Sequence, residues 1–170
     1  MNWPSLEQLC AAFPAPAGMS FRYVEPRDVE TMPGLLRAWF PAASTGAESV
    51  FMDAAFWRRN LVEASDYFAI IICSGSEPIG FQAFERQPAS LTLHARLGAL
   101  APHARTGFAG ALGFGLFEAM GRLTGAEQLQ VFVTLATKGQ QLSPSAGAFA
   151  SPGSCRPSIE TWWKEEACAA

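Results

Sequence analysis

The sequence APHARTGFAGAL spans residues 101–112 and joins a strand-like segment to a helix-like one. It places Gly107, Ala109 and Gly110 just after Arg105 and just before an apolar run. Small residues of this kind permit a tight turn and a close approach of another group to the backbone. The stretch therefore has two interpretations. It either lets a helix pack closely on a sheet, or it presents successive backbone N–H groups to a phosphate at the start of that helix.

The segments on both sides of this turn alternate between strand and helix patterns. Apolar residues recur every three or four positions in the expected helices and every second position, or continuously, in the expected strands. The resulting order is β-α-α-β-β-β-α-β. It predicts an α/β (α+β) fold with a mixed, mostly antiparallel central sheet flanked by helices. The expected strands are Phe21–Tyr23, Tyr67–Cys73, Ile79–Phe84, Ser90–Ala101 and Gln128–Thr134, and the expected helices lie between Asp28 and Phe40, over Met52–Ala64 and over Phe108–Leu123.

Length and composition exclude several classes of protein. A chain of 170 residues is one ordinary domain, and a net charge of −3 gives no reason to expect a nucleic-acid partner. The four cysteines are scattered, so we predict no metal site, a buried free thiol at Cys73 and a reducing cytoplasm. The apolar segment 107–120 is too short and too rich in glycine for a membrane span, and we expect neither a signal peptide nor a membrane partner.

The element order and the turn resemble the GNAT superfamily of acyl-CoA-dependent N-acetyltransferases. The family's turn has the form Gln/Arg-x-x-Gly-x-Gly/Ala, often with a proline three residues before the arginine. Pro102 and Arg105 keep that spacing, with Gly110 at the last position and Phe108 where a glycine is expected. The register one residue earlier fits Gly107 and Ala109 but puts Ala104 in the first position. The strand GFQAFER, residues 80–86, adds to a resemblance that covers residues 19–141.

The resemblance implies acetyl-CoA as a co-substrate. In the family, the strand before the turn and the strand after the following helix diverge, and the pantetheine arm of the cofactor enters between them. Here these two strands would be Ser90–Ala101 and Gln128–Thr134. Backbone N–H groups of the turn would bind the pyrophosphate, with a charge-assisted contact from Arg105. The implied cofactor-binding residues are Ala101, Arg105, Thr106, Gly107, Phe108, Ala109 and Gly110.

Candidate catalytic residues are few. His94 alternates with apolar residues on an expected strand, and its ordinary pKa suits a general base near neutral pH, although a histidine on a strand is also a common surface residue. Glu85, on the neighbouring strand, is the alternative base, and we expect His103 to face solvent. Many family members protonate the leaving thiolate with a tyrosine that follows the last strand named above. The only tyrosines here, Tyr23 and Tyr67, come much earlier.

The chain divides into three parts: an N-terminal leader over residues 1–18, loosely held and with a short amphipathic piece, the acyl-CoA-binding domain over 19–141, and an irregular tail over 142–170. The tail is rich in Ser, Pro and Gly and offers no candidates for the family's closing strands. GC-rich codons consistent with Leu142 onward, translated in another frame, give AVAERRGIRLAGIMPAIDRDVVEGG, which resembles the family's continuation. We therefore hypothesise a frameshifted tail, which the encoding DNA sequence would verify or exclude. Without closing strands, 128–134 would be a bare edge, and the expected consequence is one of three: low stability, a homodimer formed through that edge, or binding of CoA without turnover.

Three functions remain. The first is an N-acetyltransferase that moves an acetyl group from acetyl-CoA to a primary amine of a small molecule or peptide. The second is a catalytically inactive acyl-CoA-binding or interaction module on the same scaffold, and the third is a structural α/β protein. In the family, residues 25–64 line the acceptor site; here they suit either an apolar or anionic acceptor or a helix packed on the core. The residues that allow both interpretations are Trp39, Phe56, Trp57, Arg58 and Arg59.

Overall fold

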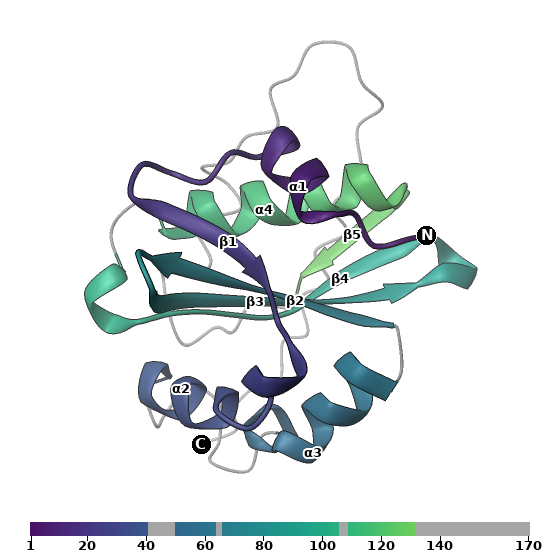
Figure 1. Cartoon of the computed structure of the whole chain (residues 1–170). Coiled ribbons are helices and arrows are strands. Elements are labelled where there is room, and N and C mark those ends of the chain that lie inside the picture. Colours follow the sequence, from purple (N-terminus) through teal and green to yellow (C-terminus); the bar gives the residue numbers. More distant parts are fainter. Residues whose placement is uncertain (41–49, 64–65, 106–108, 132–170) are drawn as a thin grey trace, which may run out of the picture.

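A computed structural model describes residues 1–40, 50–63, 66–105 and 109–131 (Figure 1). The strand residues 132–134 and the tail 142–170 that the sequence analysis predicted lie outside the described residues, so the proposed domain boundary at 141 stays a prediction. The helices and strands, in chain order, are α1 (Leu6–Ala12), β1 (Met19–Tyr23), α2 (Met32–Trp39), α3 (Ala54–Trp57), β2 (Tyr67–Ser74), β3 (Glu77–Gln87), β4 (Thr92–Leu100), α4 (Ala109–Thr124) and β5 (Gln128–Val131).

The strands form one five-stranded sheet in the order β1-β2-β3-β4-β5. The pairings from β1 to β4 are antiparallel, and β5 lies parallel to β4 after the crossover through α4. A short turn joins β2 to β3, where Gly75 adopts a φ of 58°, a left-handed conformation that favours glycine. The predicted fold class, a mixed and mostly antiparallel sheet flanked by helices, is confirmed.

The helices cover both faces of the sheet. In Figure 1, α1 and α4 lie on one side of the sheet and α2 and α3 on the other. Alternate residues of β3 point to these two layers. The ring of Phe81 lies 5.3 Å from that of Trp57 in α3, and the ring of Phe84 stacks at 6.0 Å on that of Phe117 in α4. The neighbouring strand β2 is buried from Ala69 to Cys73, which explains the nearly continuous apolar pattern of Tyr67–Cys73 in the sequence.

The N-terminal segment that we expected to be loosely held is packed on the core. The ring of Trp3 stacks on that of Phe68 in β2 with their centroids 4.8 Å apart. The ring of Phe13 lies so close to Gly115 in α4 that a Cβ atom added there would come within 2.5 Å of it. Aromatic burial of this kind stabilises a segment through both contact area and ring geometry, and here it attaches α1 to the sheet and to α4.

The helix expected over Met52–Ala64 is interrupted. Asp53 caps α3 by accepting a hydrogen bond from the backbone N–H of Ala55 at 2.8 Å, and the chain continues after α3 as a π-helical turn over Arg58–Glu63. The side-chain amide of Asn60 donates to the carbonyl of Phe56 at 2.7 Å. A side chain that takes a helical carbonyl competes with the regular backbone ladder. Periodicity alone could not separate this arrangement from a continuous helix.

Candidate active site

The parallel strands β4 and β5 are paired over only part of β4. Their register runs from Thr92 opposite Gln128 to Ala95 opposite Val131. Beyond Ala95, β4 continues to Leu100, and in the part of the chain that the structure describes nothing pairs with its outer side there. The outer side of β4 from Arg96 to Leu100 is called the open edge below.

A β-bulge marks the start of the open edge. In the β3–β4 ladder Phe84 lies opposite Ala95, whereas Ala83 lies opposite Leu97, so Arg96 is the extra residue. A bulge bends its strand and increases the local twist. Here it lies directly after the last described pairing between β4 and β5, at Ala95 and Val131.

The chain leaves the open edge through a short turn and returns as α4. Ala101 is buried, and its backbone N–H donates to the carbonyl of Ile79 at 2.8 Å, which holds the turn Pro102–Ala104 at the end of the sheet. Because α4 begins at Ala109, the free N–H groups and positive dipole end of a 16-residue helix follow this turn. Thr106, Gly107 and Phe108 lie outside the described residues, and so do the side chains at 109 and 110.

Arg105 connects the turn to α2, an arrangement for which the sequence contains no signal. Its Nε donates to the carbonyl of Leu100 at 3.1 Å, and its Nη2 donates to the carbonyl of Trp39 at the end of α2. The predicted contact between Arg105 and a phosphate stays a prediction, and the guanidinium keeps further N–H groups with which to make it.

His94 lies in β4 just before the bulge, on the α2/α3 side of the sheet. It sits opposite Glu85 of β3 and Gln130 of β5, and only 6% of its surface is exposed. Neither ring nitrogen has a hydrogen-bond partner among the described residues. Burial lowers the pKa of His94, and the positive charge of Arg96 acts in the same direction, whereas Glu85 raises it. The imidazole is therefore neutral at pH 7 and able to accept a proton.

Charged and polar groups accompany His94 on the same face. Glu85 and Arg96 form an ion pair with 3.3 Å between Oε2 and Nε, and their side chains are 23% and 32% exposed. Tyr67 of β2 lies opposite Glu85, and burial raises the pKa of its hydroxyl. We call Tyr67, Glu85, His94 and Arg96 the polar row. Two of its members, His94 and Glu85, are the candidate bases predicted from the sequence. Thr92, His94 and Arg96 occupy alternate positions of one strand in the sequence, which is the signal that could have added Arg96.

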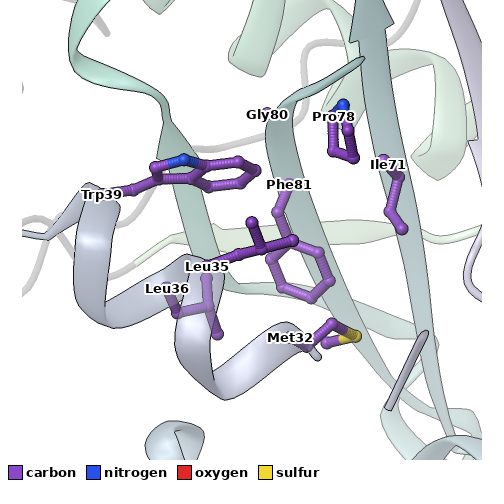
Figure 2. A pocket seen from close by; sticks show the side chains of 8 residues that line it. All are labelled: Met32, Leu35, Leu36, Trp39, Ile71, Pro78, Gly80 and Phe81. Carbon is purple, nitrogen blue, oxygen red and sulfur yellow. The ribbon is translucent and has the colours of Figure 1, made fainter. Parts of the chain in front are cut away.

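Most of the expected acceptor-site residues belong to the core. Trp57 is fully buried and its indole N–H donates to the carbonyl of Phe51 at 2.8 Å, and Trp39 is also buried. Figure 2 shows Trp39 and neighbouring side chains of α2 against β3, around a cavity of only about 10 Å³, the space for a single water at most. The sequence allowed two interpretations of this segment, an acceptor site or a helix packed on the core. The positions of Trp39 and Trp57 agree with the second. His103 is exposed, as predicted, and its Nε2 lies 3.7 Å from Oε1 of Glu77.

A larger cavity, of about 210 Å³, lies at β1, the edge of the sheet farthest in strand order from the open edge. It is lined by Val24, Glu25, Pro26, Val29, Leu61 and Val62. Apart from Val24, these residues belong to the segment 25–64 that was expected to line the acceptor site, and none of them is a predicted catalytic or cofactor-binding residue. Among the described residues, no three His, Cys, Asp or Glu side chains are grouped so as to hold a metal ion. No helix in the described ranges is long and apolar enough to cross a membrane.

The described residues place a turn and the N-terminus of α4 after β4, and α4 leads into β5, which pairs parallel with β4. No protein-family model and no curated protein matches the sequence. Solved structures do match. A GNAT-family protein from Desulfovibrio desulfuricans is 20% identical, with a TM-score of 0.56 over 76% of this chain and 80% of that one.

Two further structures extend the match. Spermidine N-acetyltransferase from Vibrio cholerae, a dodecamer, is 14% identical with a TM-score of 0.59, covering 81% of this chain and 82% of its own. PaiA N-acetyltransferase from Thermoplasma acidophilum, solved in complex with coenzyme A, is 13% identical with a TM-score of 0.57, covering 76% and 87%. The chain therefore has the GNAT acetyltransferase fold, and the resemblance inferred from the turn and the element order is confirmed at the level of the fold.

Proposed function

We propose that this protein is an N-acetyltransferase that moves an acetyl group from acetyl-CoA to a primary amine. The observation that carries the proposal is the open edge of β4, which begins at a bulge and leads into the turn before α4. The likeness in fold to N-acetyltransferases, one of them solved with coenzyme A, supports it.

The residues at the opening fit a ligand with amide groups and phosphates. The backbone of Arg96–Leu100 offers hydrogen bonds to amides, as a neighbouring strand would. The N-terminal turn of α4, with Arg105, Gly107 and Gly110 in the preceding and first positions, suits an anion. The full proposed set is that of the sequence analysis: Ala101, Arg105, Thr106, Gly107, Phe108, Ala109 and Gly110. When bound, acetyl-CoA supplies the activated acetyl thioester.

His94 is the proposed general base. Its neutral ring, its burial and its unpartnered nitrogens support this role. The acceptor arrives as an ammonium at neutral pH and must lose a proton before its nitrogen can attack a carbonyl. A positioned base that takes this proton contributes roughly 10²–10⁴ in rate. Glu85, opposite His94, is the alternative base.

A catalytically inactive acyl-CoA-binding module is the second candidate. The observation that favours it is the position of the two tyrosines. Tyr23 donates its hydroxyl hydrogen to the carbonyl of Pro4 at 3.0 Å, and burial raises the pKa of Tyr67, so neither is suited to release a proton to a thiolate. The enzyme would have to protonate its leaving group from water.

Thermal unfolding with acetyl-CoA and with CoA tests the binding half of the proposal. A ligand at a hundred times its dissociation constant stabilises a fold by about 2.7 kcal/mol. We expect a clear rise in Tm for the natural protein, and its loss when Gly107 and Gly110 are both replaced by Leu. Gly34→Leu is the matched control, because a side chain there meets no other atom. No rise at millimolar acetyl-CoA would contradict both candidate functions.

Release of CoA thiol in the presence of a panel of amines tests the catalytic half. Amine-dependent release identifies an acetyltransferase, whereas binding without release under any condition identifies the inactive module. The homodimer through the outer side of β5 also stays a proposal, and sedimentation velocity measures it.

A further inference from the structure

The polar row brings opposite charges to the place where β4 leaves β5. Tyr67 of β2, Glu85 of β3 and His94 of β4 lie opposite one another across three neighbouring strands. Arg96, at the bulge, forms an ion pair with Glu85. Residues directly opposite in a sheet share a face. All four side chains therefore lie on the α2/α3 side, beside the open edge.

The groups of this row keep unused bonding capacity. The Nε of Arg96 is buried and, although it lies 3.3 Å from Glu85, makes no hydrogen bond of good geometry. Both nitrogens of His94 are likewise unpartnered within the described chain. Buried polar groups are normally hydrogen-bonded, and each one that is not carries a cost of about 1–3 kcal/mol. Three such atoms next to one another indicate a place where a polar ligand completes the bonding.

The charges limit which ligand suits the site. Glu85 attracts an ammonium group, but Arg96 beside it repels the same group, and with His94 neutral the row has no net charge. A polycation such as a polyamine would gain nothing from this field. A ligand with one ammonium and one carboxylate group would match it, because Arg96 recognises a carboxylate with its planar set of donors.

We propose that the acceptor is a small amine that also carries a carboxylate group, as an amino acid does, with Glu85 holding its amine and Arg96 its carboxylate. This inference rests on the proposed function and names its substrate class. His94, between the two strands of the opening, takes the proton from the bound amine. The acceptor therefore differs from that of the spermidine N-acetyltransferase to which the fold is similar.

Binding measurements separate this inference from catalysis. The protein is saturated with CoA, which cannot donate an acetyl group, and titrated with the standard α-amino acids, the decarboxylated amine of each and spermidine, with Tm as the readout. We expect at least one amino acid to bind about tenfold or more tightly than its decarboxylated amine, the difference that one charged hydrogen-bonded contact supplies. Equal or tighter binding of the decarboxylated amines or of spermidine would overturn the inference, as would binding of no amino acid.

Two single variants test whether the polar row causes the tighter binding of the amino acid. Arg96→Met should remove the preference for the amino acid while the response to CoA persists. Arg122→Met, which removes an exposed guanidinium paired with Glu118 on α4, is the matched control and should leave the preference unchanged. An unchanged preference in Arg96→Met would contradict the assignment.

A charge swap excludes a merely structural role. The double variant Glu85→Arg, Arg96→Glu keeps an ion pair in the row but exchanges its two ends. If the pair only held the strands together, the double variant would bind the amino acid with an affinity within about twofold of that of the natural protein. We expect instead that its affinity falls by about tenfold or more. Binding of CoA without amine-dependent release of its thiol from acetyl-CoA would count against the proposed function and leaves this binding test intact.

Discussion

The two halves of the sheet differ in how much of their strands is paired with a neighbouring strand. From β1 to β3 the strands pair along their whole lengths, and the register slips only at Ile72 and Cys73. From β4 to β5 the pairing stops after Ala95, and β4 continues alone on its outer side within the described residues. The first half, apart from the outer side of β1, is paired and is expected to carry most of the stability, whereas the second leaves the outer side of β4 beyond Ala95 unpaired among the described residues. Substitutions in the two halves should consequently affect different measurements.

Trp57→Ala should have the largest effect on stability. Trp57 is fully buried between α3 and β3, and its indole N–H bonds to Phe51. Removing a buried aromatic side chain costs about 3–5 kcal/mol in the free energy of unfolding. Urea denaturation should show the loss, with Trp57→Phe as a milder comparison. A decrease of less than about 1 kcal/mol in the free energy of unfolding would mean that the half of the sheet from β1 to β3 does not carry most of the stability.

Asp28→Asn should have an intermediate effect. Asp28 accepts two hydrogen bonds from the Arg22 guanidinium, at 2.7 and 2.9 Å, and one from the N–H of Glu25 at 2.8 Å. Hydrogen bonds to a charged group contribute about 1.5–3 kcal/mol. The variant should unfold at lower urea concentration at pH 7.

The same carboxylate predicts a pH dependence. The hydrogen bond from Arg22, more than any other contact, lowers the pKa of Asp28. The unfolded chain therefore binds this proton more readily, and the stabilisation is complete above about pH 4 and is lost as the pH falls through the native pKa. Asp28→Asn should remove that part of the acid dependence. An identical dependence in both proteins would contradict the assignment.

His94→Leu should have the smallest effect on stability and a large one on function. Leucine replaces a buried ring whose nitrogens lack partners in the described structure, so the free energy of unfolding should stay within about 1 kcal/mol or rise. Acetyl transfer, if His94 is the base, should fall by roughly 10² or more. Loss of stability and activity together would indicate a structural histidine.

The pH profile of the natural protein sharpens this prediction. Burial lowers the pKa of His94 against the opposing effect of Glu85, and the base acts in its neutral form. Activity should therefore rise with pH along a limb centred below the ordinary histidine value of about 6.5 and be near its maximum at pH 7. Since the unfolded chain protonates this histidine more easily, its contribution to stability is lost as the pH falls below that value.

The sequence predicted the order of elements because each has a clear apolar period and is bounded by turn residues. It also placed the turn after β4 and the two strands, β4 and β5, that pair in parallel. It could not predict the bulge at Arg96, which depends on the register against β3, or the π-helical turn, which depends on a side-chain bond of Asn60. Long-range contacts were equally out of reach: those of Trp3 with the sheet and of Arg105 with α2 join positions far apart in the chain.

Hydrogen exchange of the backbone amides, with and without acetyl-CoA, tests the central claim most directly. If the open edge of β4 and the turn before α4 hold the ligand, peptides covering residues 96–112 should gain protection, while those of β1 and β2, at the other end of the strand order, should change little. Protection that appears instead around the cavity at β1, or an open edge that exchanges equally fast with and without acetyl-CoA, would contradict the account.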